Sequence, residues 1–339
     1  MSATRAMSAA TPAAAANFSA QRGALAAAAR WRLPFSRNAW RGLAGNWLGA
    51  GAGSSLDFQD HRGYVPGDDP RHIHWQAFAR TGALTMKLYR AEVAPFVDLA
   101  VDTSASMTLT PAKAARTDEL VAFCVECADR AGAPVRIHAV SGRMVRAISV
   151  DEVRAGRWRE RLPAAMTGSS GGAAPSPRGE SEANAPHGAT AQRGAAAASA
   201  KSTASDPTVM PGPLPWRPGA LKVLISDLLF AGDPSALLVP LASGAGVGVV
   251  LAPALIEEGE LEWRGNVELT DCESGTVRRQ RVDEALATRY ATAYARHFTL
   301  WREACRRRGV LFARVPAEPA LAVALGGEAL AGGAVEAHA

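Results

Sequence analysis

Three oxygen-bearing side chains alternate with small neighbours at Asp102, Ser104 and Ser106. On a tight turn their carboxylate and hydroxyl oxygens can converge on one ion, and hard oxygen donors suit Mg²⁺ or Mn²⁺ and fit zinc poorly. Asp227 is a candidate second carboxylate from a neighbouring loop. With water, these side chains can fill an octahedral shell and leave one position for the carboxylate of a partner. Serine and aspartate are also common in turns, so a purely structural turn is the alternative interpretation.

Two apolar segments end at the two aspartates. Ala94–Asp102 (APFVDLAVD) and Leu221–Asp227 (LKVLISD) are short apolar runs of the kind that form buried strands. Parallel sheets bind ligands at the carboxyl ends of their strands, near the point where the strand order reverses. We therefore expect both aspartates at one edge of a sheet.

The other elements alternate between strands and helices. Further strands are expected at Pro134–Val140, Arg143–Ser149, Val247–Ala252 and Val310–Val315, and a hairpin at Asn266–Asp271 and Thr276–Val282. Helices are expected at Gly23–Arg30, Pro111–Ala131, Asp151–Ala165, Pro234–Ser243, Asp283–Arg308 and Glu318–Leu330. This order predicts an α/β fold with a mostly parallel sheet and helices on both faces, plus a small β-rich N-terminal and hairpin elaboration.

The composition divides the chain into four regions. Residues 1–30 are Ala-rich and predict a disordered tail, and residues 31–92 are expected to pack on the core. The main domain is expected to comprise residues 93–165 and 214–331. Between its halves, residues 166–213 are almost entirely Gly, Ala, Ser and Pro, which predicts a flexible insertion.

Positive charge is concentrated at the N-terminus. Residues 1–56 hold six arginines and no acidic residue, and subtracting these six charges from the total of +5 leaves −1 on the rest. A near-neutral domain argues against nucleic acid as a partner. We expect no membrane span, because no long uninterrupted apolar run is present. Four scattered cysteines indicate no disulfide framework, and the chain is interpreted as cytoplasmic, although its acid-free start also fits an organelle transit peptide.

A long motif lies upstream of Asp102. The segment 53–107 resembles the bacterial domain of unknown function 58 family, and looser similarity extends to about residue 255. The residues that match the hallmark of the family are Arg62, Tyr64, Pro66, Gly67, Asp68, Arg71, Ile73, Trp75, Ala79 and Arg80. His74 departs from the family pattern, which usually has Asp at this position.

This resemblance implies a von Willebrand factor A-like fold and a neighbouring MoxR-type AAA+ ATPase as partner. It also implies that Asp102, Ser104, Ser106 and Asp227 form a metal-ion-dependent adhesion site. Such a site takes a threonine from a second loop. Thr167 is the candidate, although no motif spacing in the sequence identifies it. No phosphate-binding loop of the Walker type is present, so an ATPase would be a separate chain.

The side chains of this motif have two possible roles. Its turn Pro66–Pro70 is strongly indicated by composition. The functional interpretation is a partner-docking surface, and the alternative is a structural clasp that holds the turn against the domain. The side chains concerned are Arg62, Tyr64, Asp68, Arg71, Trp75 and Arg80.

Together these observations predict a non-enzymatic, divalent-metal-dependent protein-binding module that works with a MoxR-type ATPase in complex assembly or maturation. One alternative is a metal-dependent phosphoester hydrolase in which Asp102 or a bound water attacks phosphate. Another is a scaffold with a degenerate metal site.

Overall fold

A six-stranded sheet forms the centre of the molecule, with strand order β11-β8-β7-β4-β5-β6. The structure is a computed structural model that describes residues 12–37, 40, 43–166, 213–230 and 232–338. Every neighbouring pair in this sheet is parallel except β5 and β6, which are antiparallel. Its strands are β4 (Val97–Asp102), β5 (Val135–Ser141), β6 (Met144–Ile148), β7 (Leu221–Ile225), β8 (Val247–Ala254) and β11 (Leu311–Pro316). The expected α/β class with a mostly parallel sheet is confirmed.

The strand order reverses between β4 and β7. From β4 the chain proceeds outward to β5 and β6, and it then returns to the other side of β4 for β7, β8 and β11. Every residue of β4 and β7 is buried, because helices cover both faces of the sheet. The loops that follow β4 and β7 therefore separate at the point where open α/β sheets bind ligands.

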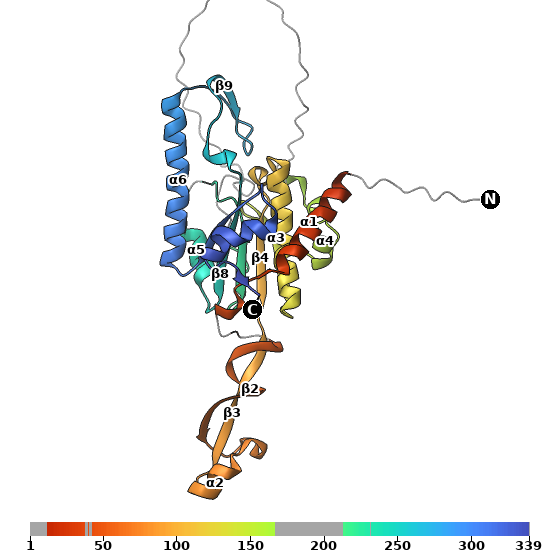
Figure 1. Cartoon of the computed structure of the whole chain (residues 1–339), viewed down its shortest axis with the longest axis vertical. Helices are drawn as coiled ribbons and strands as arrows, with labels where there is room; N and C mark the ends of the chain where they lie inside the picture. The colour runs from red at the N-terminus through yellow and green to blue at the C-terminus, as the bar shows by residue number, and fades with distance from the viewer. Residues whose placement is uncertain (1–11, 38–39, 41–42, 167–212, 231, 339) are drawn as a thin grey trace, which may run out of the picture.

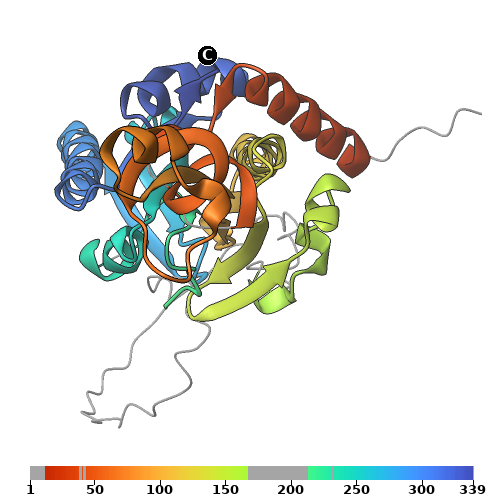
Figure 2. The same cartoon turned by 90° about the horizontal axis from the view of Figure 1, so that it is seen from below.

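Helices lie on both faces of the sheet (Figures 1 and 2). One apolar core joins α1 (Pro12–Ala28), α3 (Pro111–Arg130) and the helical segment after residue 320 to Val97, Leu99 and Val101 of β4. The other core joins α5 (Ser235–Ala242) and α6 (Glu284–Arg307) to Ala100 of the same strand. Alternate residues of one strand thus face opposite layers.

The N-terminal helix differs from the expected tail. The prediction of disorder over residues 1–30 is wrong for α1, in which Ala24, Ala27 and Ala28 are buried against α3. Alanines at three- and four-residue spacing allow two helix backbones to approach closely, whereas a search for large apolar side chains finds no signal here. After α1, β1 (Trp31–Arg32) pairs with β12 (Glu336–Ala337) and joins the two ends of the described chain.

Two helices are shorter than expected. For Asp151–Ala165 the structure has α4 (Val150–Arg154), whose N-cap is Ser149 rather than Asp151, in a reciprocal capping box with Glu152. Gly156 then adopts a left-handed φ of 66°, which ends the helix. Short helical turns follow at η4 (Arg159–Arg161) and η5 (Ala164–Met166).

The last expected helix, Glu318–Leu330, is also divided. It begins at Leu321 as α7 (Leu321–Ala324) and continues as the π-helical segment η8 (Leu325–Ala329). Gly327 has non-helical backbone angles, which interrupts regular α-helical hydrogen bonding at this point.

Two hairpins complete the fold. The first, here called the arm, pairs β2 (Leu43–Gly63) with β3 (Thr85–Ala94) and projects away from the sheet (Figure 1). The second pairs β9 (Gly265–Thr270) with β10 (Val277–Val282), near one end of α6. The remaining short elements are η1 (Phe35–Arg37), η2 (Pro70–His72), α2 (Trp75–Thr81), η3 (Ala105–Thr108) and η7 (Glu257–Gly259). Residues 167–212, most of the expected insertion, lie outside the described residues.

Candidate metal site at the switch point of the sheet

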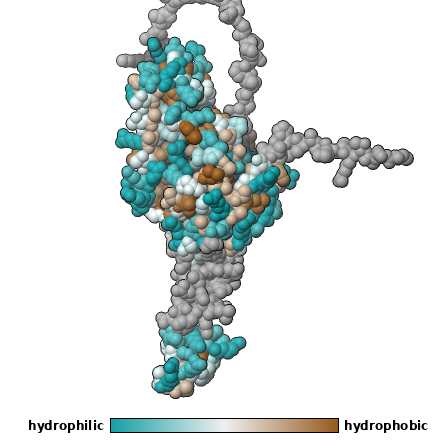
Figure 3. All heavy atoms as spheres, in the orientation of Figure 1, coloured by the Kyte–Doolittle hydropathy of each residue, from teal (hydrophilic) through white to brown (hydrophobic). Residues whose placement is uncertain are grey.

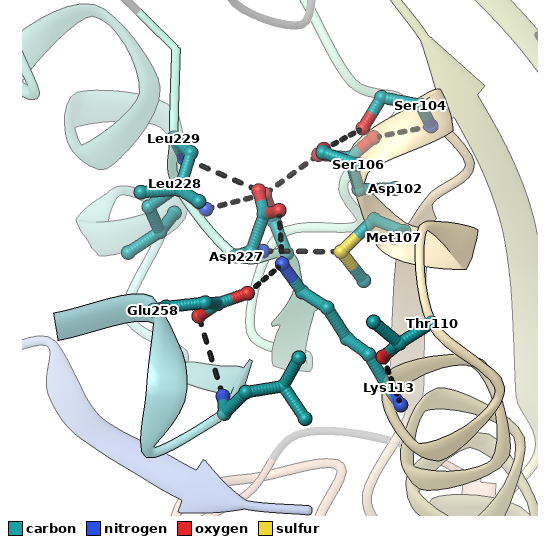
Figure 4. A network of polar contacts seen from close by, with 12 residues as sticks. Asp102, Ser104, Ser106, Met107, Thr110, Lys113, Asp227, Leu228, Leu229 and Glu258 are labelled. Carbon is teal, nitrogen blue, oxygen red and sulfur yellow. Dashed lines mark hydrogen bonds and ion pairs between the residues drawn. The ribbon is translucent and has the colours of Figure 1, made fainter. Parts of the chain in front are cut away.

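Asp102 and Asp227 lie where the loops after β4 and β7 separate. Asp102 is the last residue of β4, and Asp227 follows the end of β7 by two residues. Both carboxylates are buried, with exposed fractions of 4% and 2%. Figure 4 shows them converging with the hydroxyls of Ser104 and Ser106. The structure therefore brings together four of the five side chains proposed as metal ligands.

Hydrogen bonds fix the loop after Asp102. One carboxylate oxygen accepts the backbone N–H of Ser104 at 2.9 Å, and the other accepts the hydroxyl of Ser226 at 2.7 Å. The hydroxyl oxygens of Ser104 and Ser106 are 3.1 Å apart. This turn points both hydroxyls in the same direction, as the alternating spacing predicts.

Asp102 is a carboxylate without a direct cationic partner in the described part of the chain. Burial raises its pKa to about 6, and the nearby negative charge of Asp227 acts in the same direction. Hydrogen bonds from Ser104 and Ser226 offset part of this effect. Two carboxylates that face each other in a buried site favour a bound proton or a bound cation.

Lys113 supplies one positive charge to the site, on the side of Asp227. Its ammonium donates to Asp227 Oδ2 at 2.7 Å and to Glu258 Oε1 at 2.6 Å. Burial disfavours this ammonium, but the charges of Asp227 and Glu258 outweigh burial and hold the pKa of Lys113 above its ordinary value. No motif in the sequence singles out Lys113 or Glu258. One signal was available, because a lysine in the first turn of a helix opposes the helix dipole and needs a specific partner.

The backbone after Asp227 is held in an uncommon conformation. Leu228 has a φ of 61°, a left-handed angle that a leucine rarely adopts. The hydroxyl of Ser226 accepts the N–H of Leu228, and Asp227 Oδ1 accepts the N–H of Leu229. The N–H of Asp227 itself contacts the sulfur of Met107 at 3.2 Å. Such strain is commonly kept at functional loops, where neighbouring contacts enforce it.

A further carboxylate reaches the site from the second hairpin. Glu273 accepts the backbone N–H of Ala105 at 3.1 Å and that of Ser106 at 2.8 Å. It lies in the loop between β9 and β10, more than 160 residues away in sequence. No residue pattern predicts this contact, because it depends on the tertiary placement of the hairpin.

The oxygen-only donor set fits a hard divalent cation in kind. Within the described ranges there is no cluster of three or more His, Cys, Asp or Glu side chains that could hold a metal ion, so a site here depends on the serine oxygens. Asp227 Oδ2 is already bound by Lys113, although a carboxylate oxygen retains a second lone pair. Thr167, the candidate threonine, lies outside the described residues.

The family motif lies at the far end of the arm. Arg62 donates to Asp68 Oδ1 at 2.6 Å, and Asp68 Oδ2 accepts the N–H of Val65 at 2.9 Å, so this ion pair fixes the turn. Trp75 is 57% exposed and stacks edge-on against Phe78. The end of the arm is mostly hydrophilic on the face shown in Figure 3.

The structural-clasp interpretation of this motif is wrong. Arg71, Trp75 and Arg80 are exposed, and α2 packs on β3 of the arm rather than on the domain (Figure 1). Tyr64 is half-buried and also belongs to the arm, where its N–H bonds the carbonyl of Leu84. The motif thus shapes the end of the arm.

The protein has an α/β domain. Two buried carboxylates, Asp102 and Asp227, lie at the edge of its sheet where the strand order reverses. Residues 60–154 match the family model described as "Protein of unknown function DUF58", which supports the resemblance given by the motif. The match includes the Asp102 loop and ends before Asp227. No curated protein and no solved structure matches the chain. Among the described helices, none combines the length and the apolar character needed to cross a bilayer.

Proposed function

We propose that this protein is a divalent-metal-dependent protein-binding module of the von Willebrand factor A type, with Mg²⁺ or Mn²⁺ at the Asp102–Asp227 edge. One observation carries the proposal: the buried Asp102 carboxylate faces Asp227 and two serine hydroxyls at the switch point, and no cation among the described residues pairs with it. A divalent ion would supply the missing charge. Asp102, Ser104, Ser106 and Asp227 would hold it, and the ion would bind the acidic side chain of a partner.

The proposed partner is a MoxR-type AAA+ ATPase in the cytoplasm, and the joint task is complex assembly or maturation. This part rests on the match to the DUF58 family over residues 60–154. The arm offers a second contact, because Trp75 and Phe78 are exposed at its end, and Arg71 and Arg80 are exposed on the same short segment of the chain. Aromatic and arginine side chains are the residues most enriched at protein–protein contacts.

A binding assay with a purified MoxR-type ATPase tests the proposal. The full-length chain, immobilised, should retain the ATPase in Mg²⁺ and release it in EDTA. Asp102→Ala should abolish retention with the fold intact by circular dichroism. Asp129→Ala is the matched control, because Asp129 is an exposed partner of Arg154 far from the site. Equal retention in Mg²⁺ and EDTA, or by Asp102→Ala, would reject the proposed function.

The alternative of a scaffold with a degenerate site has one observation in its favour. The ammonium of Lys113 already neutralises Asp227, as a bound cation would. The two functions differ in a direct measurement, because a scaffold of this kind takes up no Mg²⁺ or Mn²⁺ in calorimetric titration.

A further inference from the structure

The loop of the β9–β10 hairpin contacts the serine loop of the site through one side chain. Both carboxylate oxygens of Glu273 are engaged, one by the N–H of Ala105 and one by the N–H of Ser106. These two N–H groups belong to the loop that carries the hydroxyls of Ser104 and Ser106, which would hold the ion. A carboxylate therefore already lies against the backbone of the loop that carries two of the candidate metal ligands.

The hairpin loop is built to present this glutamate. Asp271 Oδ1 accepts the N–H of Glu273 at 2.9 Å, and Asp271 Oδ2 accepts the hydroxyl of Ser274 at 2.9 Å. The N–H of Gly275 closes the loop on the carbonyl of Asp271 at 2.8 Å, and Gly275 has a left-handed φ of 68°. None of these bonds involves the serine loop, so the loop can keep its shape when Glu273 is elsewhere.

Apart from this contact, the hairpin is weakly attached to the domain. Val282 is the only buried residue of its two strands. A cavity of about 560 Å³ lies between the hairpin, the segment after β8 and α6, where a packed core would otherwise hold the hairpin in place. Its apolar lining includes Leu109, Leu255, Trp263, Leu269, Leu286 and Tyr290. Few buried contacts permit a segment to open without unfolding the domain.

We propose that Glu273 is an internal ligand of the site, occupying the position in which the carboxylate of a partner binds. The inference rests on the proposed function and adds the regulation of that site. The partner presents an acidic side chain on a tight turn, as the loop Asp271–Gly275 does, and it binds by displacing the hairpin. Because the internal carboxylate is tethered, its effective concentration is in the millimolar range, and an external ligand competes against it.

Hydrogen exchange of the full-length chain tests the contact without metal. Glu273→Gln keeps the size of the side chain and removes its charge, so peptides covering residues 103–109 should exchange about tenfold faster than in the wild type. Glu268→Gln is the matched control, because Glu268 lies in the same hairpin and pairs with Arg279. Unchanged exchange in Glu273→Gln, or an equal change in Glu268→Gln, overturns the proposal.

Binding in trans tests the ligand position. The probe is a cyclic peptide that carries residues 270–276 with Cys272→Ser, in which the residue corresponding to Glu273 is either Glu or Gln. In Mg²⁺, the Glu peptide should bind the Glu273→Gln chain about tenfold or more tightly than the wild type, and the Gln peptide should bind neither. Mg²⁺ uptake by calorimetry separates the two claims. If no variant binds Mg²⁺, the proposed function fails; if Mg²⁺ binds but both chains take the Glu peptide equally, the internal ligand is rejected.

Discussion

Strand β4 carries a buried aspartate near each end, Asp98 and Asp102, and the two have opposite electrostatic surroundings. At the amino end, Asp98 accepts a bidentate pair of hydrogen bonds from Arg136, both at 3.1 Å, and further bonds from the side chain and backbone of Arg217. At the carboxyl end, Asp102 receives hydrogen bonds only from the neutral groups of Ser104 and Ser226 among the described residues.

The pKa directions follow from this difference. Burial alone would raise the pKa of Asp98, but the bonds from Arg136 and Arg217 outweigh it and hold the pKa below its ordinary value. Burial and Asp227 raise the pKa of Asp102 to about 6. A buried carboxylate with its cations in place is structural, since it joins residues 215–217 to the sheet. A buried carboxylate without one is a candidate for function.

Lys113→Met should change stability most, because it leaves the buried Asp227 and the partly buried Glu258 without their ammonium. We expect a loss of about 4 kcal/mol of unfolding free energy in EDTA at pH 7.5, measured by denaturant titration. Mg²⁺ should restore more stability to this variant than to the wild type, since it frees Asp227 Oδ2.

Lys222→Met is the control for this variant. Lys222 is equally buried but donates to the carbonyls of Pro240 and Ser243 rather than to a carboxylate. Its loss should also destabilise the fold, with no added response to Mg²⁺. An equal Mg²⁺ response in both variants would contradict the assignment of Lys113 to the site.

Asp98→Asn should cost about 3 kcal/mol, because two arginines lose their carboxylate at the other end of the strand. The folded pKa of Asp98 is depressed, so this contribution is present above the unfolded value of 3.8 and is lost only as the pH falls through the lower folded pKa. Denaturation at pH 5 and pH 8 should therefore give the same loss. A loss confined to one of these pH values would show that the arginine pairs are not its origin.

Asp102→Asn should increase the stability of the fold at neutral pH in EDTA, whereas Asp98→Asn lowers it. In the folded state the pKa of Asp102 is raised to about 6. The bound proton therefore stabilises the fold fully below pH 3.8, the unfolded pKa, and this stabilisation is lost as the pH rises through about 6. In EDTA the stability of the variant should be close to that of the wild type near pH 4 and exceed it by about 3 kcal/mol at pH 7.5. Thermal melts across this range measure the difference. A variant less stable than the wild type at pH 7.5 in EDTA would contradict the absence of a compensating cation.

Asp68→Asn completes the series with an exposed pair at the end of the arm. Asp68 binds Arg62 there in solvent, where an ion pair stabilises little. The unfolding free energy should not change measurably, by the same denaturant titration. A large loss would mean that the arm is coupled to the folding of the domain.

The sequence predicted strands and helices where apolar residues repeat at a regular spacing, or where an apolar run ends in a polar residue. Apolar runs that end in Asp102 and near Asp227 predicted two neighbouring strands, and the parallel sheet brought their ends together. The expected helix Gly23–Arg30 overlaps only the C-terminal part of α1, because the packing of α1 depends on small residues, and composition did not predict the early end of α4 at Gly156. The roles of Lys113 and Glu273 depend on contacts across more than 100 residues. The position of Lys113 in the first turn of a helix indicates that it needs a partner, but local spacing does not identify the partner of either residue.

Calorimetric titration of the full-length chain with Mg²⁺ and Mn²⁺ at pH 7.5 tests the central claim most directly. We expect saturable binding of one ion per chain in the wild type, its loss in Asp102→Asn, and unchanged binding in Asp129→Ala. No saturable binding by the wild type, or equal binding by Asp102→Asn, would contradict a metal site at this edge of the sheet.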